Sequence, residues 1–250
     1  MKKVFFKFFC LALLFMVSWG CGYQYHKKDF DRYAHPEVKT IGVLEPDGLS
    51  KCLVGGVDIH YYLLGPAVGH LAAEADAQSK TNQFNRLLRE RNFGGAKELL
   101  ETLTAELQNI GYSVKILKVQ RKRIEFFEKY DALEQADAYL DLIFPLTWYH
   151  SSGPISTTSK RSPENRLYHP ELLCHVRLVK PGHKVIYDNR ISFGLMFAKL
   201  SQINIPVDQQ YFFDTFDALM NDPDRAIEGL KTGASLIVKR IAQDLSVQGK

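Results

Sequence analysis

Apolar residues recur at helical spacing in two segments of the chain. The first segment begins after Gly94 and ends before Gly111, and glycine is well suited to the position just beyond a helix. The second begins at Asp222, which can cap a helix, and Pro223, which suits the first helical turn. Its apolar stripe comprises Ile227, Leu230, Ala234, Ile237, Ile241 and Leu245. A stripe of this kind predicts a helix that covers a sheet.

Short β-prone runs lie before and between these helices. Residues 38–44 form the first, and an alternating run at 113–119 follows the first helix directly, which predicts a strand-helix-strand crossover. Residues 138–144 have strand character until Pro145 interrupts them. Residues 123–136 carry a weaker apolar pattern, which we interpret as a second helix.

A β-hairpin is predicted near the middle of the chain. Residues 171–180 alternate strongly, and alternation resumes over 185–193. Between them Pro181 fixes its own φ, and Gly182 accepts a positive φ, so the pair suits a tight turn. The order strand, helix, strand, strand, hairpin, helix predicts an α+β fold, a mixed β-sheet with helices packed on one face.

The N-terminus has the pattern of a secretion signal. Lys2 and Lys3 precede an apolar run over residues 8–17. A membrane-spanning helix needs about 20 apolar residues, so this run is too short to be a permanent anchor. We therefore expect residues 1–20 to be a signal peptide that is removed on export.

The processing site resembles the bacterial lipobox, in which a small residue precedes the lipidated cysteine. Gly20 stands before Cys21 in this way, and the resemblance implies that lipid on Cys21 holds the protein on a membrane. The alternative is ordinary signal cleavage, which leaves Cys21 a plain cysteine. Gly22 lacks the acidic side chain that often retains enteric lipoproteins in the inner membrane. Similarity to those proteins implies the periplasmic face of the outer membrane.

The rest of the chain divides into a lipidated tether over residues 21–37, which are mostly polar, and a single periplasmic domain over residues 38–250. The formal net charge of +4 falls to about +1 once the three signal-peptide lysines are removed. Nucleic acid is therefore not expected as a partner. The dense basic cluster at 121–123 is interpreted as solvated surface.

Three stretches carry a family resemblance. Residues 136–142, residues 176–179 with the turn and strand after them, and the terminal amphipathic helix resemble envelope lipoproteins built on a TolB N-terminal-like or CsgG-like domain. That family is mostly non-enzymatic. The resemblance implies protein contacts in envelope assembly, secretion or transport, and it supplies no catalytic residue to carry over.

Motifs for catalysis are not found in the sequence. The segment around Ser235 lacks the second glycine of a nucleophile elbow, and no phosphate-binding loop occurs, so we assign no catalytic residue and no cofactor. Asp58, His60 and His70 are residue types that bind zinc, but their spacing matches no established zinc motif. A periplasmic metal-binding protein or hydrolase centred on these three residues is the alternative function.

Two cysteines remain after the signal peptide and Cys21 are set aside. Cys52 and Cys174 could form a disulfide in an oxidising periplasm. They could equally be two buried thiols, because Cys174 lies on the apolar side of its predicted strand. The sequence leaves both interpretations open.

Partner contacts are expected on irregular segments that are rich in aromatic residues. Residues 55–77 are interpreted as a buried helix interrupted near Gly65, while residues 148–170 and 193–220 are interpreted as long connections, where binding residues often lie. The candidate partner-binding residues are Trp148, Tyr149, Tyr211, Phe212 and Phe213. The sequence thus favours a non-catalytic, lipid-anchored periplasmic protein that binds envelope proteins or copies of itself.

Overall fold

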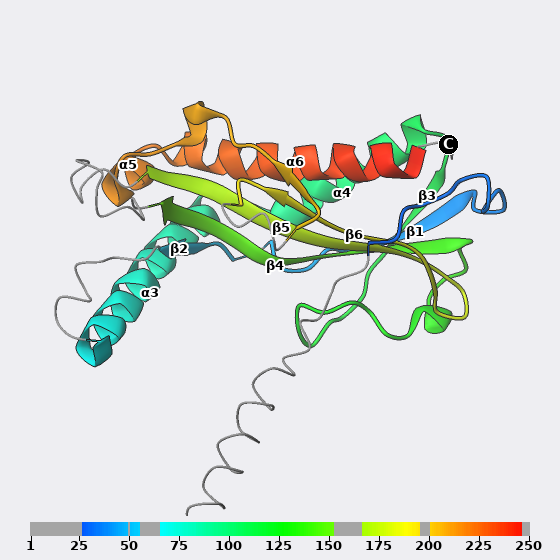
Figure 1. Ribbon diagram of the computed structural model, residues 1–250, viewed down its shortest axis with the longest axis horizontal. Helices are drawn as coiled ribbons and strands as arrows, with labels where there is room; N and C mark the ends of the chain where they lie inside the picture. Colours follow the sequence, from blue (N-terminus) through cyan, green and yellow to red (C-terminus); the bar gives the residue numbers. More distant parts are fainter. Residues whose placement is uncertain (1–26, 50, 56–65, 153–166, 196–200, 247–250) are drawn as a thin grey trace, which may run out of the picture.

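The computed structural model describes residues 27–49, 51–55, 66–152, 167–195 and 201–246. Within these segments the chain forms a mixed seven-stranded sheet whose long strands are covered on one face by helices (Figure 1). This is the α+β architecture that the sequence predicts. The predicted signal peptide and Cys21 lie outside the described residues.

The elements follow one another in mixed order. The strands are β1 (Thr40–Leu44), β2 (Leu53–Gly55), β3 (Ser113–Leu117), β4 (Ala138–Ser152), β5 (Leu167–Lys180), β6 (Lys184–Phe193) and β7 (Ile203–Ile205). The helices are α3 (Pro66–Glu90), α4 (Gly95–Asn109), α5 (Phe216–Asn221) and α6 (Pro223–Ser246), with short 3-10 helices η1 (Tyr130–Ala132) and η3 (Gln209–Tyr211). The sheet order is β3-β1-β4-β5-β6-β7, and β2 pairs with the far half of β4.

The predicted strand-helix-strand crossover is confirmed. Leu99, Leu103 and Leu107 of α4 are buried against the sheet. Gly111 follows the helix with a φ of +93°, a conformation that costs glycine little, and the chain then turns into β3. Strand β3 lies parallel to β1, with Val114 opposite Ile41.

The predicted hairpin is confirmed as β5 and β6, which pair in antiparallel register. The turn between them contains Gly182 and His183, both with positive φ. Alternation along β5 places Cys174 and Val176 on the helix-covered face, where both are fully buried. His175, between them, lies on the opposite face and is only partly buried.

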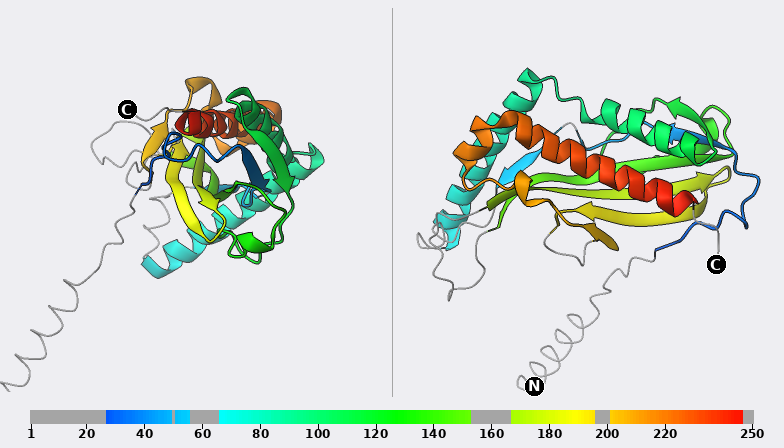
Figure 2. Two further views of the ribbon diagram at one scale, coloured as in Figure 1. Left: turned by 90° about the vertical axis from the view of Figure 1, so that its right-hand side faces the viewer. Right: turned by 90° about the horizontal axis from the view of Figure 1, so that it is seen from above.

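The terminal helix α6 covers β5 and β6, and the stripe predicted for it is buried along its whole length. Figure 2 shows α4 and α6 side by side on one face of the sheet. Gly233 permits this close approach, because a Cβ there would lie only 2.5 Å from side-chain atoms of Leu172 and of Phe193. The side chains of Leu172 and Phe193 therefore pack directly against the backbone of the helix at this point.

Strand β4 does not end at Pro145, contrary to the prediction. The register with β5 shifts between Ile143 and Leu146, so the residue that lacks an N–H falls in an irregular step of the ladder. The strand then continues to Ser152. Residues 148–152 and 167–170, predicted to be loop, are therefore strand.

The helix predicted over residues 123–136 is also wrong. Apart from η1, residues 118–137 contain no helix, and we call this segment the strap. It crosses the sheet face opposite α4 and α6 (Figures 1 and 2). Its Phe127 and Leu133, with Val119, pack against a second, smaller core around Tyr130 and Tyr139.

Residues 27–37, predicted as part of the tether, pack against the domain instead. Lys28 forms an isolated antiparallel bridge with Asp188 of β6, and Phe30 is buried. The guanidinium of Arg32 donates to the carbonyl of Ile110 at the end of α4, where a positive charge is favoured. Residues 27–37 therefore belong to the folded domain.

Helix α3 lies across one end of the sheet, at the far left of Figure 1. Its Phe84 and Leu88 are buried, and the ring of Phe84 meets that of Tyr149 edge to face at a centroid distance of 5.3 Å. The N-terminal part of this helix is more exposed. Among the described residues, none of the helices combines the length and apolar content that crossing a membrane requires.

We expect Ile237→Asp to unfold the domain or to expose it to degradation. Ile237 is fully buried in α6, so the variant puts an unpaired charge among apolar side chains, at a cost of several kcal/mol out of the roughly 5 to 15 that stabilise a domain. Lys239→Asp, at an exposed position of the same helix, should change stability by about 0.5 kcal/mol at most. Thermal melts check both, and equal melts would show that α6 is not a core element.

Candidate functional site

The sheet face opposite α4 and α6 carries several polar and aromatic side chains. Two features divide it. The strap covers the half near the β5–β6 turn, and the other half carries a cluster that we call the patch. The patch consists of Leu53, Trp148, His150, His169, Glu171 and Phe212.

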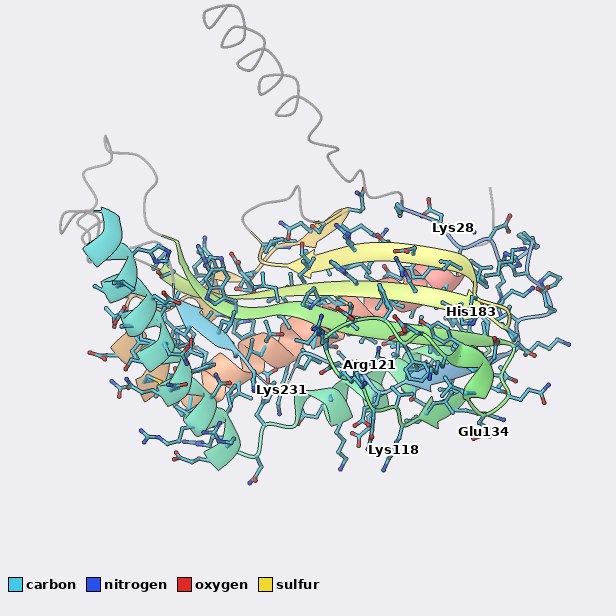
Figure 3. All side chains as sticks on the ribbon, turned by 90° about the horizontal axis from the view of Figure 1, so that it is seen from below. Lys28, Lys118, Arg121, Glu134, His183 and Lys231 are labelled. Atoms are coloured by element: carbon cyan, nitrogen blue, oxygen red, sulfur yellow. The ribbon has the colours of Figure 1, made fainter. Side chains whose placement is uncertain are left out.

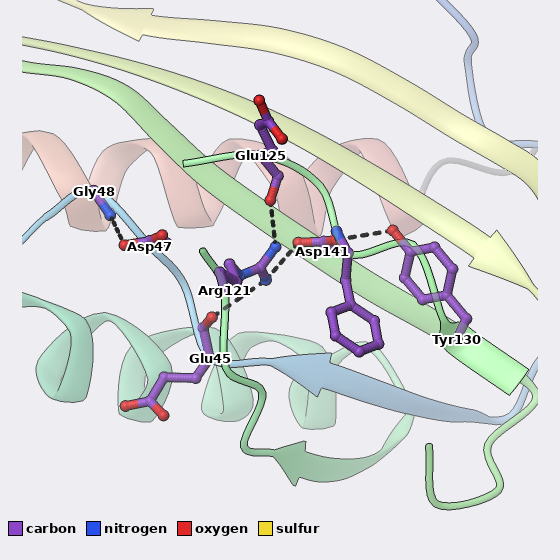
Figure 4. Close-up of polar contacts among 8 residues, drawn as sticks. Glu45, Asp47, Gly48, Arg121, Glu125, Tyr130 and Asp141 are labelled. Carbon is purple, nitrogen blue, oxygen red and sulfur yellow. Dashed lines mark hydrogen bonds and ion pairs between the residues drawn. The ribbon is translucent and has the colours of Figure 1, made fainter. Parts of the chain in front are cut away.

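The strap is held to the sheet by Asp141 of β4 (Figure 4). Arg121 Nη2 donates to Asp141 Oδ1 at 2.7 Å. Phe127 N–H and Tyr130 O–H donate to Asp141 Oδ2 at 2.7 and 2.8 Å. Arg121 also bridges the strap itself, because its Nη1 donates to the carbonyl of Glu125 at 2.9 Å. One carboxylate thus organises three points of a segment that has almost no secondary structure of its own.

We call Asp141 with its three donors the Asp141 hub. The hub is buried, so the balance of its charges matters for stability. The side chains of Asp141 and Arg121 are both almost completely inaccessible to solvent. Each charge has lost its hydration and depends on the other for compensation. Burial, followed by the charge of Asp141, raises the pKa of Tyr130 well above its usual range, so its phenol stays a hydrogen-bond donor.

Three further contacts hold the strap, all to the β5–β6 hairpin. The guanidinium of Arg177 lies 4.2 Å from the ring centroid of Phe126, and its Nε donates to Asp188 at 2.6 Å. At the turn, Asp131 accepts a hydrogen bond from Gly182 N–H at 3.1 Å. Its other oxygen lies 3.1 Å from His183 Nε2.

A cavity of about 470 Å³ lies between the strap and the hairpin. Its lining includes Ile124, Phe126, Phe127, Ile143, His175 and Val185. Burial, reinforced by the charge of Arg190, lowers the pKa of His175 to about 4, so its imidazole is neutral at neutral pH. Glu125, Glu128, Arg177 and His183 also line the cavity, so its wall combines apolar and aromatic side chains with charged ones.

The patch is built by the pairing of β2, β4 and β5. Leu53 lies opposite Trp148, and His150 lies opposite His169, so these side chains project from one face. The Trp148 and His150 rings meet edge to face at 4.5 Å, and His169 stacks on Phe212 at 5.0 Å. Leu53 lies at the edge of the patch and is 49% exposed, so the patch offers apolar area to a partner.

The imidazoles of the patch differ in their surroundings. His169 Nε2 lies 3.2 Å from a carboxylate oxygen of Glu171, and both side chains are buried. His150 is buried, and its Nδ1 has no hydrogen-bond partner in the described part of the chain. Burial lowers the pKa of His150, although the charge of Glu171 opposes this. His150 is therefore a neutral ring at neutral pH.

The structure separates the five residues predicted to bind partners. Trp148 and Phe212 belong to the patch, but Tyr149, Tyr211 and Phe213 are buried beneath the terminal helix. Tyr149 O–H donates to the carbonyl of Ala226 at 2.6 Å. Tyr211 O–H and the Thr232 hydroxyl lie 3.0 Å apart. These three aromatic residues position α6 and are not available to a partner.

Sequence reasoning missed Leu53, His150, His169 and Glu171. Residues 148–170 were predicted to be a loop. Residues 148–152 (Trp-Tyr-His-Ser-Ser) and 167–171 (Leu-Tyr-His-Pro-Glu) do not alternate between apolar and polar types, so neither stretch carried a local strand signal. Their pairing across the sheet, which brings the two histidines together, is not a local property.

The alternative metal site receives no support from the described residues. His70 lies exposed on α3, while Asp58 and His60 lie outside the described residues. In the segments that the structure describes, no group of three or more His, Cys, Asp or Glu side chains could hold a metal ion.

Cys52 and Cys174 are free thiols in the structure, and both are fully buried. Burial raises the pKa of each well above its usual range. The backbone N–H of Cys52 donates to Asn85 Oδ1 at 2.9 Å, which ties β2 to α3. Of the two interpretations open from the sequence, the structure has the pair of buried thiols.

Comparison with known proteins assigns no family. No family model matches the chain, and no match was found among curated proteins. A crystal structure of protein XCC0632 from Xanthomonas campestris, of family model DUF330, aligns over 88% of this chain and 86% of that one, with 7% identity and a TM-score of 0.37. At this TM-score the likeness assigns neither fold nor function to the chain.

We expect Asp141→Asn to destabilise the protein by about 3 to 5 kcal/mol, because it leaves the buried Arg121 charge without compensation. Glu101→Gln is the matched control. It removes a carboxylate from an exposed pair with Lys97 and should cost less than about 1 kcal/mol.

The two effects are measured by denaturant unfolding, and limited trypsin digestion reports the strap. In Asp141→Asn, cleavage after Lys122 and Arg123 should accelerate. The double variant Arg121→Met, Asp141→Asn should be more stable than Asp141→Asn alone, because it removes the uncompensated guanidinium while the amide oxygen at position 141 can still accept a hydrogen bond. If Asp141→Asn were as stable and as resistant to trypsin as Glu101→Gln, the contacts of Asp141 would not be what holds the strap.

Proposed function

We propose that this protein is a non-catalytic, lipid-anchored envelope protein that binds protein partners through the patch. Lipid on Cys21 holds it on the periplasmic face of the outer membrane, and the domain presents the patch to another envelope protein. The family resemblance of residues 136–142 and 176–179 supports the class of function. The patch supports the mode of binding.

The observation that carries the proposal is the composition of the patch. Trp148 and Phe212 are aromatic anchors, and residues of this kind supply much of the binding energy at protein interfaces. Leu53 extends the apolar area at the edge of the patch, while His169 and Glu171 add polar groups beside the aromatic rings. His169 and Glu171 are themselves buried, so the area open to a partner comes from Trp148, Phe212 and Leu53, and aromatic residues are enriched at protein interfaces.

The position of the patch also favours a protein partner. It lies on the face of the sheet that α4 and α6 leave uncovered, and it spans three adjacent strands. Such a surface fits another folded surface better than it fits a small molecule, which needs a deep cleft. The metal-binding or hydrolytic alternative, centred on Asp58, His60 and His70, remains a hypothesis from the sequence.

We expect Cys21→Ser to release the protein from membranes or to leave it unprocessed. The substitution removes the thiol that would accept the lipid, and the remaining tether has no apolar segment of its own. Membrane fractionation and the intact mass of the mature protein check this. Unchanged fractionation together with an unchanged mass would contradict lipidation at Cys21.

We expect a photo-crosslinking amino acid at position 53 to capture an envelope protein in intact cells. The matched control is position 116, because Ile116 is 50% exposed and Leu53 is 49% exposed, but Ile116 lies on the edge strand β3. Crosslinks at 53 that disappear in Trp148→Ala and are absent at 116 would support the patch as the binding surface.

Two outcomes would contradict the proposal. Identical crosslinked species at both positions, or a species at 53 unchanged by Trp148→Ala, would assign partner binding to another surface. Circular dichroism of Trp148→Ala confirms that the variant stays folded. A crosslink of the chain to itself identifies the partner as a second copy.

A further inference from the structure

The strap presents an unusual set of exposed side chains. Arg121 turns inward to Asp141, so the dense basic cluster of the sequence is divided between the interior and the surface. The exposed charged residues of the strap between 118 and 129 are Lys118, Lys122, Arg123, Glu125, Glu128 and Lys129. Among them lies Ile124, a large apolar side chain that is 44% exposed. Further along the strap the exposed acids Asp131, Glu134 and Asp137 bind His183, Lys115 and the backbone N–H of Thr40, so the unpaired basic charge is confined to the part around Ile124. Basic residues around an exposed isoleucine are typical of segments that contact anionic lipid surfaces.

The start of the described chain is connected to the strap through three consecutive contacts. Lys28 bridges Asp188 through the backbone, and the Asp188 carboxylate binds Arg177. Arg177 in turn lies over the ring of Phe126 in the strap. Figure 3 looks onto this face and shows Lys28, Lys118 and Arg121 in the half of the molecule away from α3.

The length of chain before Lys27 limits how far this half can stand from a lipid on Cys21. Six residue steps separate the two positions, and a fully extended chain covers about 3.6 Å per step, so the Cα atoms are at most about 22 Å apart. Attraction between charges is largely screened beyond one Debye length, about 8 Å at physiological ionic strength, so the strap must come into contact with the lipid headgroups to bind them. An anchor on Cys21 keeps this half of the domain within reach of the membrane surface, a step that rests on the proposed lipidation.

We propose that the strap is a second membrane contact, which binds the headgroups of anionic phospholipids. Lys118, Lys122 and Arg123 contact the lipid phosphates, and Ile124 enters the interface between headgroups and acyl chains. The Asp141 hub holds the strap in the shape that presents these side chains. Lipid on Cys21 supplies proximity, and the strap fixes which side of the domain faces the membrane.

The test places an environment-sensitive fluorophore on Ile124→Cys in the purified full-length protein. Cys52 and Cys174 are buried and should stay unlabelled. Leu71→Cys is the matched control, because Leu71 is 68% exposed but lies on α3, at the other end of the sheet. The protein is combined with vesicles of phosphatidylcholine, with or without phosphatidylglycerol.

We expect a blue shift of the probe at 124 only with vesicles that contain phosphatidylglycerol, and none at 71. High salt should reverse the shift, because it screens charges at the surface. Adding Lys122→Gln and Arg123→Gln should weaken the contact by about fivefold for each charge removed. Both side chains are exposed, so thermal melts of these variants should match the parent.

The result that overturns the inference is an unshifted probe at 124 on both vesicle types while the protein is bound to them. A shift unaffected by salt and by the glutamine substitutions would also overturn it, since it would be an apolar contact only. The anchor is decided separately by the mass of the mature protein. If that mass contains no lipid, the same probe is measured in a Cys21→Ser background, so that the free Cys21 thiol takes no label. The strap contact then stands or fails on the phosphatidylglycerol-dependent shift.

Discussion

Burial of the α6 stripe against β5 and β6 decides which face of the sheet is the core. The side chains of a strand alternate between faces, so once Cys174 and Val176 point at the helix, His175 and Arg177 must point away. Gly233 brings the helix close enough that no slip of one residue would fit. The character of the opposite face is therefore a consequence of how the terminal helix packs.

The opposite face is covered differently, because no α-helix packs on it in the described part of the chain. One half is closed by the strap, whose irregular backbone is held through Asp141 and through the hairpin turn. The other half is the patch, in which Trp148 and Phe212 are partly exposed and the two imidazoles are buried beside them. A single sheet thus carries a sealed core on one side and, on the other, a fixed segment beside a binding surface.

The parts of the fold that follow from local periodicity were predictable. Helices α4 and α6 and the β5–β6 hairpin each have a complete pattern within one stretch of sequence, and their termini carry capping or turn residues. The strap was not predictable, since its helical pattern loses to hydrogen bonds with Asp141, which no local pattern shows. The prediction that the strand ends at Pro145 was wrong because the pairing with β5 is also not visible in the local sequence. The rule that proline interrupts a ladder holds, but an irregular step in the register accommodates it and the strand continues.

The candidate site was only partly predictable, because aromatic content does not tell surface from core. Trp148 and its neighbour Tyr149 are both aromatic, but the alternation of side chains along β4 places the Tyr149 ring under α6 and the Trp148 ring in the patch. The same alternation connects the two proposals. Strap and patch lie on one face of one sheet, so a strap held at a lipid surface also holds the patch near that surface, turned away from α4 and α6. Partners of the patch would then be proteins that reach the membrane surface, and the Asp141 hub, by fixing the strap, would set the orientation in which they are met.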